Sequence, residues 1–228
     1  MSGNSDIILE EVWTEIQRRK GGDDTGSTVS LSNHLKSGYT TDQASQVRES
    51  IHNDAFNVVP PPVDCPAWLC IVLPCINHLK SMKAHKICTP DDAEVLRNGK
   101  WIRYDAASLV VGDVIRLEGG DIVPADCVVA VDEEDQDDFL VDQRFVTGQT
   151  RPKQVTANEV GTRNGRTLLL GGTVVQGYAT ALVTATGTDT VLGRLIKNGK
   201  FPVPENDDDE SMMDDSMNMR AMEMGTLS

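Results

Sequence analysis

Residues 93–104 read AEVLRNGKWIRY, and this stretch decides the fold class. Apolar and polar side chains alternate on both sides of the Asn98-Gly99 pair. An Asn-Gly pair between two alternating runs is the strongest short-range signal for a β-hairpin, because both residues tolerate the positive φ angles of a tight turn. We therefore predict two antiparallel strands, Ala93–Arg97 and Lys100–Tyr104.

The chain beyond this hairpin carries further short β-rich runs, most of them separated by Gly or Asp turns. They are Asp113–Leu117, Cys127–Val131, Phe139–Asp142, Arg166–Leu170, Thr173–Gln176 and Ala179–Ala185. Many short strands within about 95 residues favour a sandwich or a jelly roll. The predicted fold class is therefore mainly β, a small distorted jelly roll or β-sandwich, with a brief helix at Thr190–Ile196 closing the domain.

The N-terminal part shows helical spacing instead. A short amphipathic helix is predicted at residues 6–19, where apolar residues recur at that spacing: Ile8, Leu9, Val12, Trp13 and Ile16. The stretch Gly21–Ser32 is rich in Gly, Ser, Thr and Asp, which is typical of a linker. Thr40 and Gln43 fit the two positions of a capping box, so a second helix is expected to start at Thr40 and to end before Pro60–Pro62.

The formal net charge of −14 is concentrated in two segments. The loop Asp132–Asp138 carries six acidic residues and no base, and the segment from Glu205 to Ser228 carries eight acidic residues and only Arg220. The rest of the chain is close to neutral, so no basic surface indicates a nucleic-acid partner. The acidic, Met-rich tail has little to bury, and we expect it to be disordered.

Cysteine usage and hydropathy favour an intracellular protein without a membrane span. The five cysteines form no CxxC pair, and the first residues lack a secretory signal. The longest apolar candidate, Trp68–Ile76, has nine residues and contains Pro74, whereas a spanning helix needs ~20 residues. By itself the chain is expected to be soluble and to have no transmembrane segment of its own.

Metal binding remains an alternative at two places. Cys65, Cys70 and Cys75, together with His78 and His85, could form a thiolate and imidazole site, although their spacing matches no known zinc finger. The methionines of the tail could bind Cu(I) through their thioethers. Cysteines packed in a core and a solvated acidic tail are the plainer interpretations, so we predict no metal site.

Four segments of the β-rich region occur in an informative order. They are Leu109–Asp113 (LVVGD), Gly120–Asp126 (GDIVPAD), Val141–Pro152 (VDQRFVTGQTRP) and Gly171–Gly177 (GGTVVQG), the last followed by Thr186-Gly187, Thr190 and Gly193. Together they resemble the actuator domain of P-type ATPases, whose motifs read LVPGD, GDxVPAD, VDxSxLTGESxP and GTxVxxG…TGxxTxxG. Residues 38–58 resemble the N-terminal helical piece of that domain, and the Asp142-Gln143 pair is similar to the proton-pumping branch.

The resemblance implies a division of the chain. Residues 1–37 would form an N-terminal helix and linker, 38–58 the helical piece of the actuator, and 89–200 its β-domain. Residues 59–88 would be a Pro- and Cys-containing apolar linker where the family has a transmembrane hairpin, and 201–228 the acidic tail. The resemblance also implies a cytoplasmic location, or one at the cytoplasmic face of a membrane through a pump partner.

The loop Thr147, Gly148, Gln149 and Thr150 stands where the family has TGES. In the family this loop reaches an aspartyl phosphate on another domain, and its Glu activates the hydrolytic water as a general base. Here Gln149 replaces that Glu and Thr150 replaces the Ser. An amide cannot accept a proton, so we expect impaired chemistry; the plainer alternative is a loop that has drifted and has no chemistry.

Several family parts are missing from this sequence. It contains no DKTGT phosphorylation motif and no nucleotide-binding domain, so Mg²⁺ and ATP, which the family binds on those domains, are not expected as cofactors here. We therefore expect no ATPase activity from the isolated chain. The chain is then either a module that docks on the phosphorylation domain of a pump or regulates it, or a truncated segment of a proton- or cation-pumping ATPase; a metal-handling protein is the more distant alternative.

Overall fold

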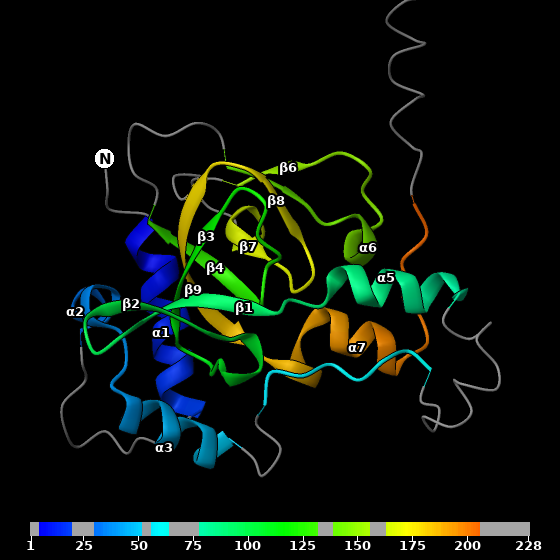
Figure 1. Cartoon of the computed structure of the whole chain (residues 1–228). Coiled ribbons are helices and arrows are strands. Elements are labelled where there is room, and N and C mark those ends of the chain that lie inside the picture. Colours follow the sequence, from blue (N-terminus) through cyan, green and yellow to red (C-terminus); the bar gives the residue numbers. More distant parts are fainter. Residues whose placement is uncertain are drawn as a thin grey trace, which may run out of the picture.

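The computed structural model describes residues 5–19, 30–51, 56–63, 78–131, 139–155 and 163–205 (Figure 1). Within these residues, the strands form two antiparallel sheets, one of six strands in the order β2-β1-β3-β9-β4-β7 and one of three in the order β6-β5-β8. The prediction of a mainly β fold is thereby confirmed.

The predicted hairpin is present. Strand β1 (Asp92–Arg97) pairs with β2 (Lys100–Asp105), and Val95 lies opposite Ile102. Asn98 and Gly99 have φ angles of 53° and 70°. Two successive positive φ angles are those of a type I′ turn, whose twist matches that of the flanking strands.

The strand at Thr173–Gln176 is present as predicted, the strand at Lys153–Gln154 was not predicted, and the other remaining strands follow the predicted order with shifted ends. The strands after the hairpin are β3 (Val114–Glu118), β4 (Asp126–Val131), β5 (Leu140–Asp142), β6 (Lys153–Gln154), β7 (Thr167–Leu168), β8 (Thr173–Gln176) and β9 (Tyr178–Ala185). The predicted strand Arg166–Leu170 is wrong at both ends, because only Thr167 and Leu168 pair with β4. Arg166 belongs to the 3₁₀ helix η3 (Arg163–Arg166), and Leu170 donates its backbone N–H to Asp126 instead of a strand.

The core lies on both faces of the six-stranded sheet. Side chains on one face, such as Val95, Val129 and Val183, pack with the three-stranded sheet. Those on the other face, such as Leu96, Val128 and Leu182, pack with the N-terminal helices. Alternate side chains of the same strand are therefore buried on opposite faces of the sheet. This explains why these strands are apolar on both faces.

Helix α1 (Ser5–Arg19) confirms the predicted amphipathic helix and lies against the sheet (Figure 1). Its buried residues are Leu9, Val12, Trp13 and Ile16. The linker predicted at Gly21–Ser32 is wrong at its end, because helix α2 (Leu31–Ser37) begins at Leu31. That helix has seven residues and buries only Leu31 and His34, so its sequence carries too little periodicity to be recognised.

Helix α3 (Thr41–Ile51) begins with the predicted capping box. The Gln43 backbone N–H donates to Thr40 Oγ1 at 3.2 Å, and the Thr40 N–H donates to Gln43 Oε1 at 2.9 Å. Both bonds satisfy N–H groups that the first helical turn leaves without a partner.

A third apolar cluster joins helices α5 (Lys80–Cys88), α6 (Arg144–Thr147) and α7 (Val191–Lys197). Within the segment predicted as an apolar linker at residues 59–88, residues 80–88 are helical and bury Ala84 and Cys88. The predicted stretch Trp68–Ile76, the cysteines at 65, 70 and 75, the loop Asp132–Asp138 and the tail from residue 206 lie outside the described residues.

Among the helices described, none has the length and apolar character that crossing a bilayer requires.

Candidate functional site

The segment that follows strand β5 is a single helical turn with an elbow at its end. The Gln143 carbonyl accepts hydrogen bonds from the Val146 N–H at 3.0 Å and the Thr147 N–H at 2.9 Å. Gly148 ends the turn in the left-handed conformation, with φ at 79°, and its N–H donates to the Arg144 carbonyl at 2.9 Å. That conformation favours glycine, because a side chain would clash with its own backbone.

The four residues of the TGES-like loop lie in and just after this turn. The Thr147 hydroxyl donates to the Gln143 carbonyl at 3.0 Å and accepts from the Gln149 N–H at 3.2 Å. Thr147 and Thr150 are half-buried and Gly148 is buried, whereas Gln149 is exposed. The turn therefore holds the backbone of Gln149 and leaves its amide side chain facing solvent.

An ion pair braces the start of the turn. Asp142 Oδ2 lies 2.6 Å from Arg144 Nη2 and 2.8 Å from Nε, and Asp142 Oδ1 accepts from the Arg144 N–H at 3.0 Å. The hydrogen bond and charge of Asp142 raise the pKa of Arg144. Because Arg144 is 43% exposed, this contact orients the turn more than it stabilises the fold.

Hydrophobic packing holds the other side of the turn. Val146 is buried in the cluster formed by Ala84 and Cys88 of α5 and by Leu192 and Ile196 of α7. The Phe145 carbonyl accepts from the Val203 N–H at 3.1 Å, so the segment after α7 is attached to α6. The loop is thus in contact with α5, α7 and the segment after α7.

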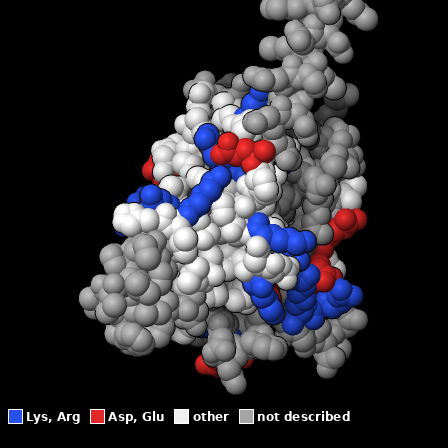
Figure 2. Space-filling view, turned by 90° about the vertical axis from the view of Figure 1, so that its right-hand side faces the viewer, with Lys and Arg blue, Asp and Glu red and all other residues white. Residues whose placement is uncertain are grey.

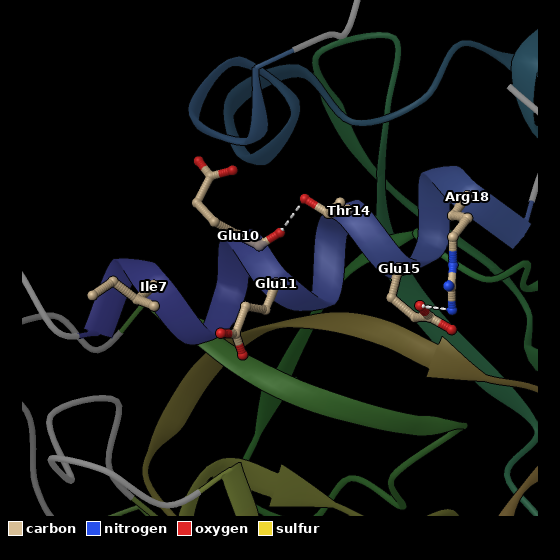
Figure 3. Close-up of a pocket in the computed structure, with 6 residues that line it drawn as sticks. All are labelled: Ile7, Glu10, Glu11, Thr14, Glu15 and Arg18. Atoms are coloured by element: carbon tan, nitrogen blue, oxygen red, sulfur yellow. Dashed lines mark hydrogen bonds and ion pairs between the residues drawn. The ribbon is translucent and has the colours of Figure 1, made fainter. Parts of the chain in front are cut away.

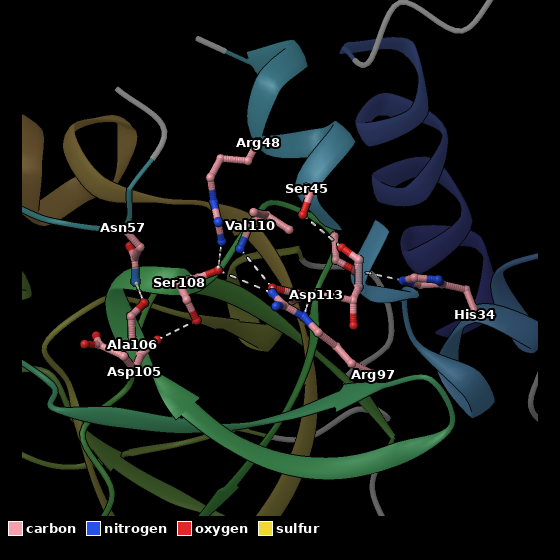
Figure 4. Close-up of polar contacts among 12 residues, drawn as sticks. His34, Ser45, Arg48, Asn57, Arg97, Asp105, Ala106, Ser108, Val110 and Asp113 are labelled. Carbon is pink, nitrogen blue, oxygen red and sulfur yellow. Dashed lines mark hydrogen bonds and ion pairs between the residues drawn. The ribbon is translucent and has the colours of Figure 1, made fainter. Parts of the chain in front are cut away.

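The aspartates of two other motifs, Asp113 and Asp126, hold the scaffold. Both carboxylate oxygens of Asp126 accept backbone N–H groups, from Leu170 at 2.9 Å and Val191 at 2.8 Å. Asp113 pairs with Arg97, and Asn57 Nδ2 donates to the carbonyls of Ala106 at 3.0 Å and Pro124 at 2.6 Å (Figure 4). Sequence reasoning missed Asn57 and Arg97, because their partners are distant in the chain.

Gln143 is a further residue that the sequence did not single out as buried. Its side chain is 6% exposed, and its Nε2 atom has no hydrogen-bond partner within the described part of the chain. A buried donor without a partner costs about 1–3 kcal/mol. Gln143 lies directly before the turn, so its carbonyl supports the loop, whereas its buried amide group is an energetic cost.

A hollow on the outer face of α1 offers no comparable chemistry (Figure 3). Its polar lining comes from α1 alone, and Glu15 pairs with Arg18 at 2.5 Å. The hydrogen bond from Arg19 is the main cause that lowers the pKa of Glu15.

The described residues contain no cluster of side chains suited to bind a metal ion. Among them, no three His, Cys, Asp or Glu side chains converge where they could hold a metal ion. Cys88 and Cys127 are buried, and burial raises the pKa of the Cys88 thiol to about 12 and that of the Cys127 thiol well above its usual value. A protonated thiol is a poor metal ligand. The predicted Cys65, Cys70 and Cys75 group is outside the described residues.

Comparison with known proteins identifies relatives of this region. Residues 87–200, half of the chain, match the family model of the P-type ATPase actuator domain. A Methanocaldococcus jannaschii protein named as a cation-transporting ATPase is 39% identical over 106 residues, which are 46% of this chain and 12% of that protein. The endoplasmic reticulum calcium ATPase of Aspergillus fumigatus is 34% identical over 122 residues, which are 51% of this chain and 12% of that protein.

A solved structure is also similar. It is the crystal structure of a zinc-transporting PIB-type ATPase in the E2.Pi state, with 26% identity and a TM-score of 0.40, and the match covers 50% of this chain and 17% of the other. This chain therefore spans only a small fraction of the length of the relatives that it matches.

Proposed function

The chain belongs to the family of the P-type ATPase actuator domain, and we propose from this that it docks the loop 147–150 on the phosphorylation domain of a P-type cation-transporting ATPase without catalysing a reaction by itself. The observation that carries the proposal is the exposed Gln149 side chain on a backbone held by Thr147 and Gly148. A turn whose backbone is held by hydrogen bonds and which exposes Gln149 is suited to contact a partner, because less conformational entropy is lost on docking.

The chemistry of the loop limits what docking can achieve. Gln149 can donate to a phosphoryl oxygen or orient a water molecule, as glutamine does in some GTPases. It cannot take a proton, and general-base catalysis is typically worth about 10²–10⁴-fold in rate. Docking of this loop is therefore proposed to hold an aspartyl phosphate rather than to hydrolyse it.

Nucleotide and Mg²⁺ belong to the domains that this sequence does not contain. The described residues bring together no group of carboxylates suited to Mg²⁺. No step of the proposal passes through either of them, and the contribution of this chain is restricted to binding and orientation. We propose a location at the cytoplasmic face of a membrane, reached through the pump partner.

The test is binding of the full chain to the isolated phosphorylation domain of a cation-transporting ATPase. Beryllium fluoride on the acceptor aspartate serves as the probe for the phosphorylated state. We expect tighter binding with beryllium fluoride than without it, and about tenfold weaker binding for Gln149→Ala, the loss expected from one good hydrogen bond of about 1.4 kcal/mol. Gln176 is exposed at the end of β8, where it lies opposite Leu140 of β5 and outside residues 147–150, so Gln176→Ala is the matched control. Equal binding by the two variants would contradict the docking role of the loop.

A second candidate is a segment of a longer pump. It is favoured by the coverage of the relatives, because the chain corresponds to 12% of each of the two ATPases. The proton-pumping branch is a finer form of this proposal and rests on the Asp142-Gln143 pair alone. Sequencing transcripts across the codon of Ser228 separates the candidates, since a frame that continues into a DKTGT motif supports the segment and a stop codon supports the module.

A further inference from the structure

A basic face lies on the side of the molecule where α5 and α7 are exposed (Figure 2). We define the basic face by six exposed residues: Lys80, Lys83 and Lys86 of α5, Arg194 and Lys197 of α7, and Lys200 just after α7. The sequence reading found no basic surface, because the body of the chain is close to neutral in sum. Folding produces one by bringing together two segments more than 100 residues apart.

Helical spacing explains why the six cations share a face. Residues three apart in a helix lie on the same side, so Lys80, Lys83 and Lys86 point outward while Ala84 and Cys88 are buried. In α7, Leu192 and Ile196 are buried in the same cluster while the basic residues face solvent. The packing of the two helices therefore forces their charges together.

The basic face has no anionic partners among the residues that the structure describes. All ion pairs among the described residues involve arginines outside the basic face. Asp142, at the neighbouring turn, is already paired with Arg144. Leu79 and Ile87 are 45% and 52% exposed on or beside α5, so apolar surface adjoins the charges. Six like charges repel one another. A partner with acidic and apolar side chains would reduce this repulsion and cover the exposed apolar surface.

The chain itself leads an acidic segment to this place. After α7, Phe201 is buried between the helices and the Val203 N–H binds the Phe145 carbonyl. Glu205, the first acidic residue of the tail, lies near enough to Arg144 of α6 for its charge to contribute, after Asp142, to the raised pKa of Arg144. The last described residues therefore run along the edge of the basic face.

Residues 206–228 have the composition that the basic face requires. They contain seven acidic residues, one arginine and six methionines. Asp207, Asp208, Asp209 and Glu210 lie two to five residues after Glu205, within a reach of roughly 17 Å at ~3.3 Å per residue. A nine-residue helix such as α5 is roughly 14 Å long at 1.5 Å per residue, so these carboxylates can reach its lysines.

We propose that residues 206–228 dock on the basic face of the same chain. The four acidic residues at 207–210 lie over the lysines of α5 and α7, and the methionines cover Leu79 and Ile87, because methionine adapts to irregular apolar surfaces. A short tether gives the segment an effective concentration in the millimolar range, so weak contacts suffice. The docked segment competes with other polyanions, such as anionic lipid surfaces or nucleic acid, for the same lysines.

The experiment measures the acetylation rate of each lysine in the full chain at low salt, by mass spectrometry. The tail variant carries Asp207→Asn, Asp208→Asn, Asp209→Asn and Glu210→Gln. The control variant removes the same number of charges from the other acidic segment, through Asp132→Asn, Glu133→Gln, Asp135→Asn and Asp137→Asn. Lys100, which is exposed on β2, is the reference.

We expect Lys83, Lys86 and Lys197 to react about threefold or more slowly than Lys100, the slowing of a group that is docked two thirds of the time. The tail variant removes this protection, and the control variant keeps it. Equal rates in the wild-type protein and the tail variant would overturn the proposal. Protection that grows with protein concentration would assign the face to a second copy, and protection that appears only with phosphatidylserine vesicles would assign it to a lipid surface; both also overturn it.

Discussion

Arg97 Nη2 lies 2.6 Å from Asp113 Oδ2, and the two side chains are 5% and 0% exposed (Figure 4). The Arg97 Nε–H donates to Asp113 Oδ1 at 3.2 Å, and the Val110 N–H donates to Oδ2 at 2.9 Å. The pair joins the end of β1 to the LVVGD motif. Burial raises the pKa of Asp113 and the hydrogen bond from Arg97 lowers it, so the carboxylate depends on its partner.

Removing one member of this pair is expected to be costly. Asp113→Ala leaves a buried guanidinium without its partner and should lower the free energy of unfolding by about 3–5 kcal/mol. The control is the exposed pair of Asp92 and Arg103, which are 50% and 55% exposed; Asp92→Ala should cost less than about 1 kcal/mol. Urea unfolding measures both. A double variant, Arg97→Met with Asp113→Leu, should recover much of the loss, and equal costs for the two single variants would contradict this account.

Asp126 should give the protein a measurable pH dependence. Burial raises its pKa, whereas the N–H groups of Leu170 and Val191 lower it. Because the pKa of the folded state lies above the unfolded value of about 3.9, the folded protein binds this proton more readily than the unfolded chain. The contribution of Asp126 to the free energy of unfolding therefore declines as the pH rises from about 4 through the raised pKa.

The measurement for Asp126 is the pH profile of stability in the wild-type protein and in Asp126→Asn. Asparagine cannot accept both N–H groups, so the variant should be about 1–3 kcal/mol less stable near neutral pH. Its deficit should grow as the pH falls toward 4, where the carboxyl contributes most. A deficit that shrinks on acidification would show that the pKa of Asp126 is lowered instead.

Cys88 should be unreactive in the folded protein. Burial, with a smaller contribution from Asp142, raises its pKa to about 12, and the thiolate is the nucleophile. Alkylation by iodoacetamide at pH 8 should be at least about 100-fold slower in the native protein than in urea. Peptide mass spectrometry measures the rate at this residue, and native alkylation at the unfolded rate would contradict the buried position of α5.

The N-terminal helix should be part of the stable unit. Trp13 is 4% exposed, and its ring lies 4.3 Å from that of His34. Trp13→Ala should lower the free energy of unfolding by about 3–5 kcal/mol, as for other large buried aromatic residues. Ile7 is 52% exposed on the same helix, so Ile7→Ala should have little effect in the same urea titration. A small effect of both variants would mean that α1 does not pack on the sheet in solution.

The sequence was most informative where a signal is local. The Asn98-Gly99 turn, the Thr40 and Gln43 capping box and the periodicity of α1 each lie within a few residues, and all three are confirmed. Helices α2 and α5 escaped prediction because they are short and bury only two residues each. Their position depends on contacts with distant strands and helices, which a single sequence does not display.

In the candidate site, too, local features could be predicted from the sequence and long-range contacts could not. The motif placed residues 147–150 in one loop, and Gly148 ends the helical turn there with a φ angle of 79°. The support of the loop could not be predicted, because Val146 packs on residues of α5 and α7, and the Phe145 carbonyl binds Val203, 58 residues later. The basic face could not be predicted either, because the net charge of the chain does not show which charged side chains folding brings together.

The central claim is that the 147–150 loop can engage an aspartyl phosphate but lacks the base to hydrolyse it. The most direct test grafts Thr147, Gly148, Gln149 and Thr150 into the matching loop of a working P-type ATPase and follows phosphoenzyme decay after a chase with unlabelled ATP. The account predicts that the phosphoenzyme forms and then decays about 10²-fold or more slowly than in the parent pump, the typical value of a general base. It also predicts that Gln149→Glu in the graft restores rapid decay, because Thr150 keeps the hydroxyl of serine. Decay of the Gln149 graft at the rate of the parent pump would contradict the account.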